Sequence, residues 1–234
     1  RSNVLARFGY IAEGLYESEE EIKERNITQF GETYPGQLVK PGDIKYKDLN
    51  GDGHIDEYDM CKIGRGDVPK YYYGFGGDFR YKNIGVGILF QGTAGADRVM
   101  EGSGIRPFTS STGGGTLYAN ITDRWSKDDP SNDNVFYPRL AWSSADPSNI
   151  NNFQTSTWWQ KDMSFLRLKQ FTVSYYFPKA WTKKSFLSGG RFYIMGSNVL
   201  TFSKFKLWDP ELNTNNGISY PNVSSYTIGV AINL

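Results

Sequence analysis

The sequence predicts an all-β fold of about six antiparallel strands, and three observations support this prediction. Large apolar residues alternate with small or polar ones in several separate segments. Aromatic residues make up 16% of the chain, and its 26 glycines fit a protein with many turns and loops. The connections between the alternating segments are very unequal in length. The strongly alternating segments therefore each have one apolar and one polar face.

The N-terminal part of the chain contains the weakest predicted strand and the one convincing helix signal. The strand would run from Phe8 to Tyr16, where the alternation is incomplete. The helix would run from Ser18 to Arg25, because serine is a favoured N-cap, glutamates follow it, and basic residues come last. We expect a short helix after a marginal strand.

Two strongly alternating segments follow, at 71–81 and 84–91, and only Lys82 and Asn83 join them, which predicts a tight hairpin. Asp78 and Arg80 fall on the polar face, where they could line a water-filled interior or form a structural ion pair. The apolar face would carry Tyr71, Tyr73, Phe75, Phe79, Tyr81, Ile84, Val86, Ile88 and Phe90.

Three further strands are predicted in the C-terminal half, at 165–177, at 190–201, where the facing is less certain, and at 224–234. In the last strand, large apolar residues share one face, namely Tyr226, Ile228, Val230, Ile232 and Leu234. The other face is small or polar, with Ser225, Thr227, Gly229, Ala231 and Asn233.

The connections are short on one side of the predicted sheet and long on the other. Segments 82–83 and 178–189 are short or moderate, whereas 17–70, 92–163 and 202–222 are long and polar. Outer-membrane β-barrels show this asymmetry, and structureless loops of such length are uncommon in compact domains. About six strands cannot close a membrane barrel, because the smallest have about eight. The sequence therefore predicts one part of a larger barrel.

Composition and motifs exclude several classes of function. A net charge of +1 gives no reason to expect nucleic acid as a partner. Cys61 is the only cysteine and His54 the only histidine, so the chain has too few of these residues for an internal disulfide and little basis for a histidine-based catalytic triad or a zinc site. Asp128 and Asp129 fit a solvated turn better than a glycosidase pair, and the glycines 113–115 fit a hinge rather than a phosphate loop. We expect no enzyme.

Residues 48–59 match a calcium-binding loop. Calcium prefers several oxygen ligands, which such a loop supplies at fixed positions. Gly53 stands at the sharp turn, Ile55 can pack inward, and Asp59 replaces the usual bidentate glutamate. The alternative is a solvated turn without metal. The predicted ligands of Ca²⁺ are Asp48, Asn50, Asp52, His54 through its carbonyl, Asp56 and Asp59.

Several motifs resemble, in order, the SusC/RagA family of TonB-dependent outer-membrane transporters of Bacteroidetes. They begin with Gly9-Tyr10 and with the run from Pro41 to Gly53, which continues to Ile63-Gly64. Further matches are Trp125, Tyr137-Pro138-Arg139, the strand from Ser164 to Tyr175, the segment from Gly196 to Phe205, and Asp209-Pro210-Glu211. The resemblance covers essentially the whole chain. One departure is the last residue, Leu234, where the family usually has an aromatic residue.

The resemblance implies that residues 1–234 form the C-terminal part of a 22-stranded barrel whose plug and N-terminal strands are not in this chain. No signal peptide opens the chain, which fits a fragment. By strand parity, segment 41–66 would be an extracellular loop carrying the calcium motif. The implied location is the bacterial outer membrane.

The function implied is the import of oligosaccharides or peptides. Implied partners are the remaining barrel and plug, outer-membrane lipid, a SusD-like surface lipoprotein and, through the plug, the TonB complex. Trp142, Trp158 and Trp159 could stack on sugars, although packing or an interface belt is the commoner role. The alternative function is a soluble, calcium-stabilised β-sandwich that binds glycans. The sandwich would bury the apolar strand faces, whereas the transporter would expose them to lipid.

Overall fold

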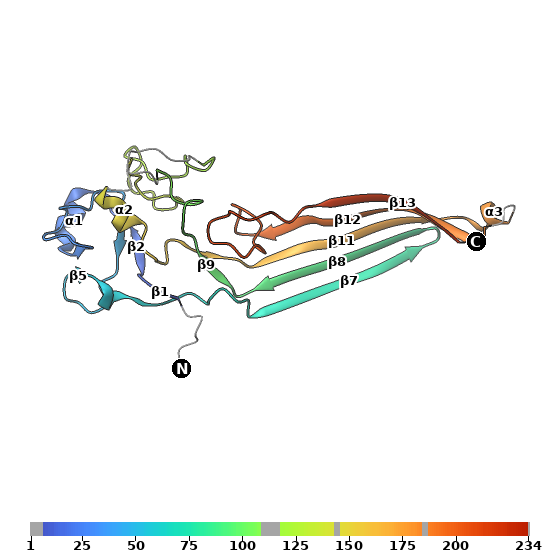
Figure 1. Ribbon diagram of the computed structural model, residues 1–234, viewed down its shortest axis with the longest axis horizontal. Coiled ribbons are helices and arrows are strands. Elements are labelled where there is room, and N and C mark those ends of the chain that lie inside the picture. Colours follow the sequence, from blue (N-terminus) through green and yellow to red (C-terminus); the bar gives the residue numbers. More distant parts are fainter. Residues whose placement is uncertain (1–6, 109–117, 143–145, 184–186, 234) are drawn as a thin grey trace. The chain divides into compact units, whose positions relative to one another are not determined.

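A computed structural model describes residues 7–108, 118–142, 146–183 and 187–233 (Figure 1). The glycines at 113–115 and Leu234 lie outside these residues, so neither expectation about them is tested. The chain divides into two compact units. The loop unit comprises 1–66, 98–161 and 214–218, and the sheet unit comprises 67–97, 162–213 and 219–234.

The sheet unit is an antiparallel sheet of five strands in the order β13-β12-β11-β8-β7 (Figure 1). The prediction of antiparallel β structure is confirmed, and two strands extend beyond their predicted ends. The hairpin at Lys82 and Asn83 is confirmed as well, with Lys82 at a φ of 53°. The strands are β7 Tyr71–Tyr81, β8 Ile84–Ala94, β11 Phe165–Tyr176, β12 Gly189–Ser203 and β13 Ser225–Asn233.

The uncertain facing of the strand at 190–201 has a structural cause. The pairing of β11 with both neighbours shifts between Leu168 and Gln170. On β12, Asn198 lies in the left-handed region with a φ of 54°, which asparagine tolerates better than most residues. Such irregularities change which face a side chain takes, so simple alternation does not continue through this point.

The loop unit consists of short elements that pair with one another within the unit. The predicted strand from Phe8 to Tyr16 is wrong as a member of the large sheet, because its residues divide between β1 and β2. The predicted helix is confirmed as α1: the Ser18 side chain accepts a hydrogen bond from the Glu21 N–H at 3.1 Å. The pairs are β1 with β6, β2 with β4, and β3 with β5, the last being parallel.

The bounds in the loop unit are β1 Arg7–Gly9, β2 Ala12–Leu15, α1 Glu19–Arg25, β3 Thr28–Gln29, β4 Ile44–Tyr46, β5 His54–Ile55, the 3-10 turn η1 Glu57–Asp59, β6 Cys61–Ile63 and α2 Pro147–Asn152. Two further strands, β9 Asp97–Val99 and β10 Gln160–Asp162, pair with each other, and α3 spans Lys179–Thr182. Among the described residues, none of the helices has the length and apolarity to cross a membrane.

The loop unit has its own hydrophobic core. Tyr10, Phe30 and Tyr46 pack ring against ring, with centroids 4.9 to 5.6 Å apart. Leu15, Ile44, Ile55 and Trp125 complete the buried cluster. The loop unit therefore folds around buried aromatic side chains, which fixes the surrounding loops.

Candidate functional site

The sheet unit has an apolar face that is exposed. Strand register places the predicted apolar residues of β7, β8, β11 and β13 together on this face. Ile228 is 82% exposed and Tyr226 is 66% exposed. A β-sandwich would bury these side chains, so the exposure argues against the alternative fold. Continuous apolar surfaces of this kind mark contact with lipid or another protein.

The opposite face is polar and bears a group of stacked cationic and aromatic residues. The Arg80 guanidinium lies 3.8 Å from the centre of the Tyr176 ring, and that of Arg191 lies 5.5 Å from the Tyr193 ring. Among the described residues, Arg80 forms no ion pair with Asp78. Its Nε donates to the Lys82 carbonyl at 3.4 Å. The structural ion pair is therefore not formed, and both charges remain on the polar face.

Tyr193 lies across the neighbouring strand at a glycine. A Cβ atom added to Gly229 would lie 2.4 Å from the Cζ atom of the Tyr193 ring. Real side chains do not approach so closely, so only glycine at this position lets the ring lie against the strand. The small polar face predicted for β13 therefore serves the packing of an aromatic side chain.

Two motifs of the sequence meet through an ion pair inside the sheet unit. Arg167 on β11 is 1% exposed and pairs with Asp209 and with Glu211, the latter at 2.9 Å. Both acids belong to the Asp-Pro-Glu motif that precedes the last strand. The ion pairs hold that connection against the sheet.

In the calcium-type loop, backbone N–H groups already contact the predicted ligands. Asp48 accepts hydrogen bonds from Gly51 at 2.7 Å and from Gly53 at 2.9 Å. Slight burial raises the pKa of Asp48, but these N–H donors outweigh it, so the pKa lies below its ordinary value. Asp52 accepts from the N–H of His54 at 2.8 Å. Asn50 donates to the second Asp52 oxygen at 2.8 Å.

Asp59 differs from the other predicted ligands because it is fully buried. One of its oxygens accepts the Leu49 N–H at 2.7 Å, and the other accepts the Asp56 N–H at 3.0 Å. Asp56 caps η1 through the Tyr58 N–H. His54 has an exposed side chain, as expected, and its Nδ1 lies 2.6 Å from Thr28 Oγ1. Ile55 packs into the core as predicted.

The acidic side chains of this loop do not converge on one point. Within the described ranges, no three histidine, cysteine, aspartate or glutamate side chains form a group that could hold a metal ion. Each carboxylate oxygen has two acceptor positions, so the hydrogen bonds of Asp48 and Asp52 leave lone pairs available. The calcium site therefore remains a prediction.

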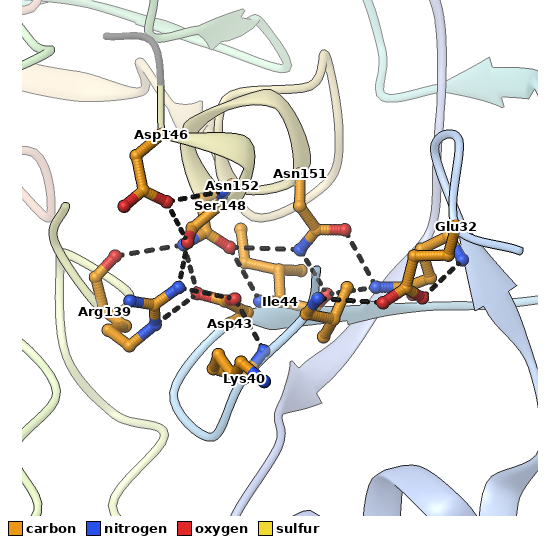
Figure 2. A network of polar contacts seen from close by, with 11 residues as sticks. Glu32, Lys40, Asp43, Ile44, Arg139, Asp146, Ser148, Asn151 and Asn152 are labelled. Atoms are coloured by element: carbon orange, nitrogen blue, oxygen red, sulfur yellow. Dashed lines mark hydrogen bonds and ion pairs between the residues drawn. The ribbon is translucent and has the colours of Figure 1, made fainter. Parts of the chain in front are cut away.

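The loop unit contains a buried polar network (Figure 2). Asp43 is fully buried, and Arg139 binds both of its oxygens, at 2.9 and 3.0 Å. Lys40 N–H and the Asn152 side chain donate to the same carboxylate at 2.9 and 2.8 Å. Burial raises the pKa of Asp43, and these donors oppose that shift. Arg139 also contacts Ser148, which accepts from its guanidinium.

The network continues through amide side chains to β3 (Figure 2). Asn152 accepts the Ile44 N–H at 2.9 Å, and Asn151 donates to the Ile44 carbonyl at 2.9 Å. Gln29 donates to Asn151 at 2.8 Å and accepts the Tyr46 N–H at 2.9 Å.

The motif that contains Asp43 is also held by close packing. Gly42, with a φ of +87°, lies directly against Trp125, where a Cβ would be 2.4 Å from the indole ring. Two distant motifs are thus joined by residues that sequence reasoning did not identify.

The tryptophans divide between packing and exposure. Trp159 is 2% exposed, stacks on Phe153 at 5.3 Å and donates to the Asn152 carbonyl at 2.7 Å, so it packs in the core. Trp142 is 68% exposed. Asp128 and Asp129 lie exposed in a turn, as expected, and Cys61 is a partly buried free thiol on β6.

No protein-family model matches the chain. The chain is similar to curated proteins from Formosa agariphila. TonB-dependent receptor P3 is 30% identical over 95% of this chain, and TonB-dependent receptor P26 is 29% identical over 94%. The chain spans 21% of the length of each of these curated relatives.

Solved structures of similar fold include that of the RagAB peptide transporter, with a TM-score of 0.64 and 21% identity, over 97% of this chain and 22% of that one. The RagAB peptide importer in the "open-open" state matches with a TM-score of 0.63 and 22% identity, over 98% of this chain and 22% of that one. At this identity the structures support the fold. The relatives are receptors and transporters, which agrees with the expectation that this is no enzyme. Over nearly its whole length the chain is therefore similar to one segment of TonB-dependent receptors, and it has the fold of the matching segment of the RagAB transporter.

Proposed function

We propose that this chain is the C-terminal part of an outer-membrane transporter that imports nutrients. The observation that carries the proposal is the sheet unit, whose apolar face is exposed while its other face is polar. Its strands of 9 to 15 residues are long enough for a tilted membrane strand, which needs about 9–11. The apolar face would contact lipid and the polar face would line the barrel interior.

The open edges of the sheet indicate that further strands must pair with it. Within the described residues, β7 and β13 each pair on one side only. Unpaired strand edges are not tolerated in hydrocarbon, so further strands must come from the rest of the transporter, in a barrel of the 22-stranded, plugged type. We further propose a SusD-like lipoprotein partner, coupling to the TonB complex through the plug, and an extracellular position for segment 41–66. Peptides, which RagAB transports by name, and oligosaccharides are both proposed substrates.

The lipid-facing assignment is tested by placing one charge on each face of β13. Lys in place of Ile228 would enter the membrane, at a cost of about 2–4 kcal/mol near the midplane, whereas Lys in place of Thr227 would face the interior. We expect Ile228→Lys to lower the amount of folded, complete transporter in outer-membrane fractions, and Thr227→Lys to leave it nearly unchanged. Equal levels for both variants, or a protein that stays monodisperse without detergent, would refute the proposal.

We also propose that segment 48–59 binds Ca²⁺. The free lone pairs on Asp48 and Asp52, the turn at Gly53 and the anchoring of Ile55 support this proposal. Because the carboxylates are held by N–H groups and Asp59 is buried, binding would require the loop to bring its oxygens closer together. The role would be structural, since the ion would stiffen an outer loop.

A further inference from the structure

The loop unit contains a pocket of about 670 Å³ beside α2, and none of its lining residues belongs to the calcium-type loop or makes the hydrogen bonds of the buried polar network. This volume lies within the range of small-molecule sites, about 300–1,000 Å³. Its lining includes Ser103, Arg106, Phe108, Ile150, Phe153 and Gln154. We call it the Arg106 pocket.

Arg106 is a cation without an anionic partner in this pocket. Of its five N–H donors, one bonds the Phe153 carbonyl at 2.8 Å. Its Nε is buried and has no hydrogen-bond partner. Arg106 forms no ion pair with any residue in the part of the chain that the structure describes. A partly buried guanidinium with unused donors is suited to a carboxylate, which it can bind with two parallel hydrogen bonds.

Neighbouring acidic residues do not supply the anionic partner that Arg106 lacks. Burial lowers the pKa of Arg106, and the negative charge of Glu101 opposes that shift. Glu101 already pairs with Arg7 at 3.6 Å and accepts a hydrogen bond from Asn215 at 2.8 Å. Arg106 therefore stays charged but lacks a dedicated counterion.

The surroundings hold the guanidinium in place. Its carbon lies 5.0 Å from the centre of the Phe153 ring, and Phe153 itself stacks on the buried Trp159. The backbone is held as well: the backbone N–H of Arg106 donates to the Gly102 carbonyl at 3.0 Å, and the carbonyl of Ile105 accepts from the Tyr137 hydroxyl at 3.0 Å. A site fixed in this way requires little reorganisation on binding.

Apolar and aromatic side chains also line the pocket. Phe108 lines the pocket and packs against Trp142, with ring centroids 5.0 Å apart. Ile150, another lining residue, is 53% exposed. Such surfaces bind the apolar face of a sugar ring or the side chains of a peptide.

We propose that the Arg106 pocket binds the carboxylate of a transported compound, with Arg106 as its charged partner. This inference rests on the proposed import function and adds a substrate class to it. The carboxylate has two possible sources, a peptide with a free C-terminus or an oligosaccharide containing a uronic acid. Both offer the same planar anion beside an apolar surface.

The test is calorimetric binding to the complete transporter in detergent. The probes are a tetrapeptide with a free C-terminus and its C-terminal amide, and a uronic-acid tetrasaccharide and a neutral tetrasaccharide. We expect at least one acidic probe to bind about tenfold or more tightly than its neutral counterpart. Arg106→Gln should abolish this preference, while Arg106→Lys should keep part of it. Arg124→Gln, which removes an exposed arginine elsewhere in the loop unit, should change nothing.

Which acidic probe binds identifies the source of the carboxylate. Equal binding of acidic and neutral probes, or an acid preference that survives Arg106→Gln, would overturn the inference. If Arg106→Gln loses all binding, retention of part of the acid preference in Arg106→Lys would still support the inference, because that variant keeps the positive charge. Uptake by whole cells is measured separately. Binding without uptake would refute the import function and leave the pocket intact, whereas uptake without acid preference would refute only the pocket.

Discussion

The two units use the same kinds of residue in opposite ways. In the sheet unit, Tyr226 and Ile228 point outward and are exposed, whereas in the loop unit Tyr46 and Ile44 are completely buried. Polar groups are reversed as well: Arg80 and Asp78 lie on an open face, and Asp43 and Asn152 lie in the core. The proposed contact of the sheet unit with lipid would explain the difference, because lipid favours apolar side chains and makes charged ones costly. Each unit is therefore expected to respond to a different class of substitution.

The largest effect should come from breaking the buried ion pair of the loop unit. Arg139→Ala leaves the Asp43 carboxylate buried without its main partner, which typically costs about 3–5 kcal/mol. We expect trypsin to cut rapidly within residues 7–66 of the complete transporter, while the strands of the sheet unit remain protected. Cleavage sites are identified by mass spectrometry.

The matched control is an exposed ion pair in the same unit. Glu13 pairs with Arg25 at 2.7 Å but is 40% exposed, so Glu13→Ala should cost at most about 1 kcal/mol. If the two variants are cleaved at equal rates, the buried network is not what stabilises the loop unit.

These differences also explain how much could be predicted from the sequence. Alternation persists along β7, β8 and β13, because in the proposed barrel each strand separates two media over its whole length, so their apolar face was predictable. The irregularity near Leu168 and Asn198 was not, because it depends on pairing between strands. The strand expected from Phe8 to Tyr16 was wrong because its backbone bonds to loops that are distant in the sequence, for example from the Tyr10 N–H to the Thr155 carbonyl at 2.9 Å.

In the loop unit, local signals were readable but long-range partners were not. Ser18 and the charges after it predicted α1 correctly because a cap acts within one turn. The motifs containing Asp43 and Arg139 were visible separately, yet no periodicity links residues 96 positions apart. Asn151, Asn152 and Arg106 had no sequence signal, since an isolated asparagine or arginine is commonly a surface residue.

An intermediate effect is expected from the packing of Tyr193 on β13. Gly229→Ala would place a methyl group 2.4 Å from the ring, and overpacking of this kind costs about 1–3 kcal/mol. The control is Gly77→Ala on β7, where the nearest atom, on Phe79, is 3.4 Å away. Urea unfolding of the complete transporter in detergent should show a lower midpoint for the first variant only. Equal midpoints would mean that Tyr193 moves freely, and that the sheet unit tolerates changes that a packed core would not.

The smallest effect should come from calcium, because the ion would stabilise one loop of a unit that already has a core. At a free concentration ten times its dissociation constant, an ion that binds only the folded state adds about 1.4 kcal/mol. Terbium can replace calcium and emit on excitation of tyrosine, and Tyr58, 74% exposed, lies beside Asp59. We expect terbium emission that is lost when calcium displaces the terbium and that is absent in Asp52→Ala. We also expect trypsin to cleave within 41–66 faster after calcium is chelated. Asp128→Ala, which removes an exposed acid from another turn, should leave both unchanged. If terbium emission is the same in both variants, hydrogen bonds alone hold the loop, and its aspartates are turn-forming residues rather than ligands.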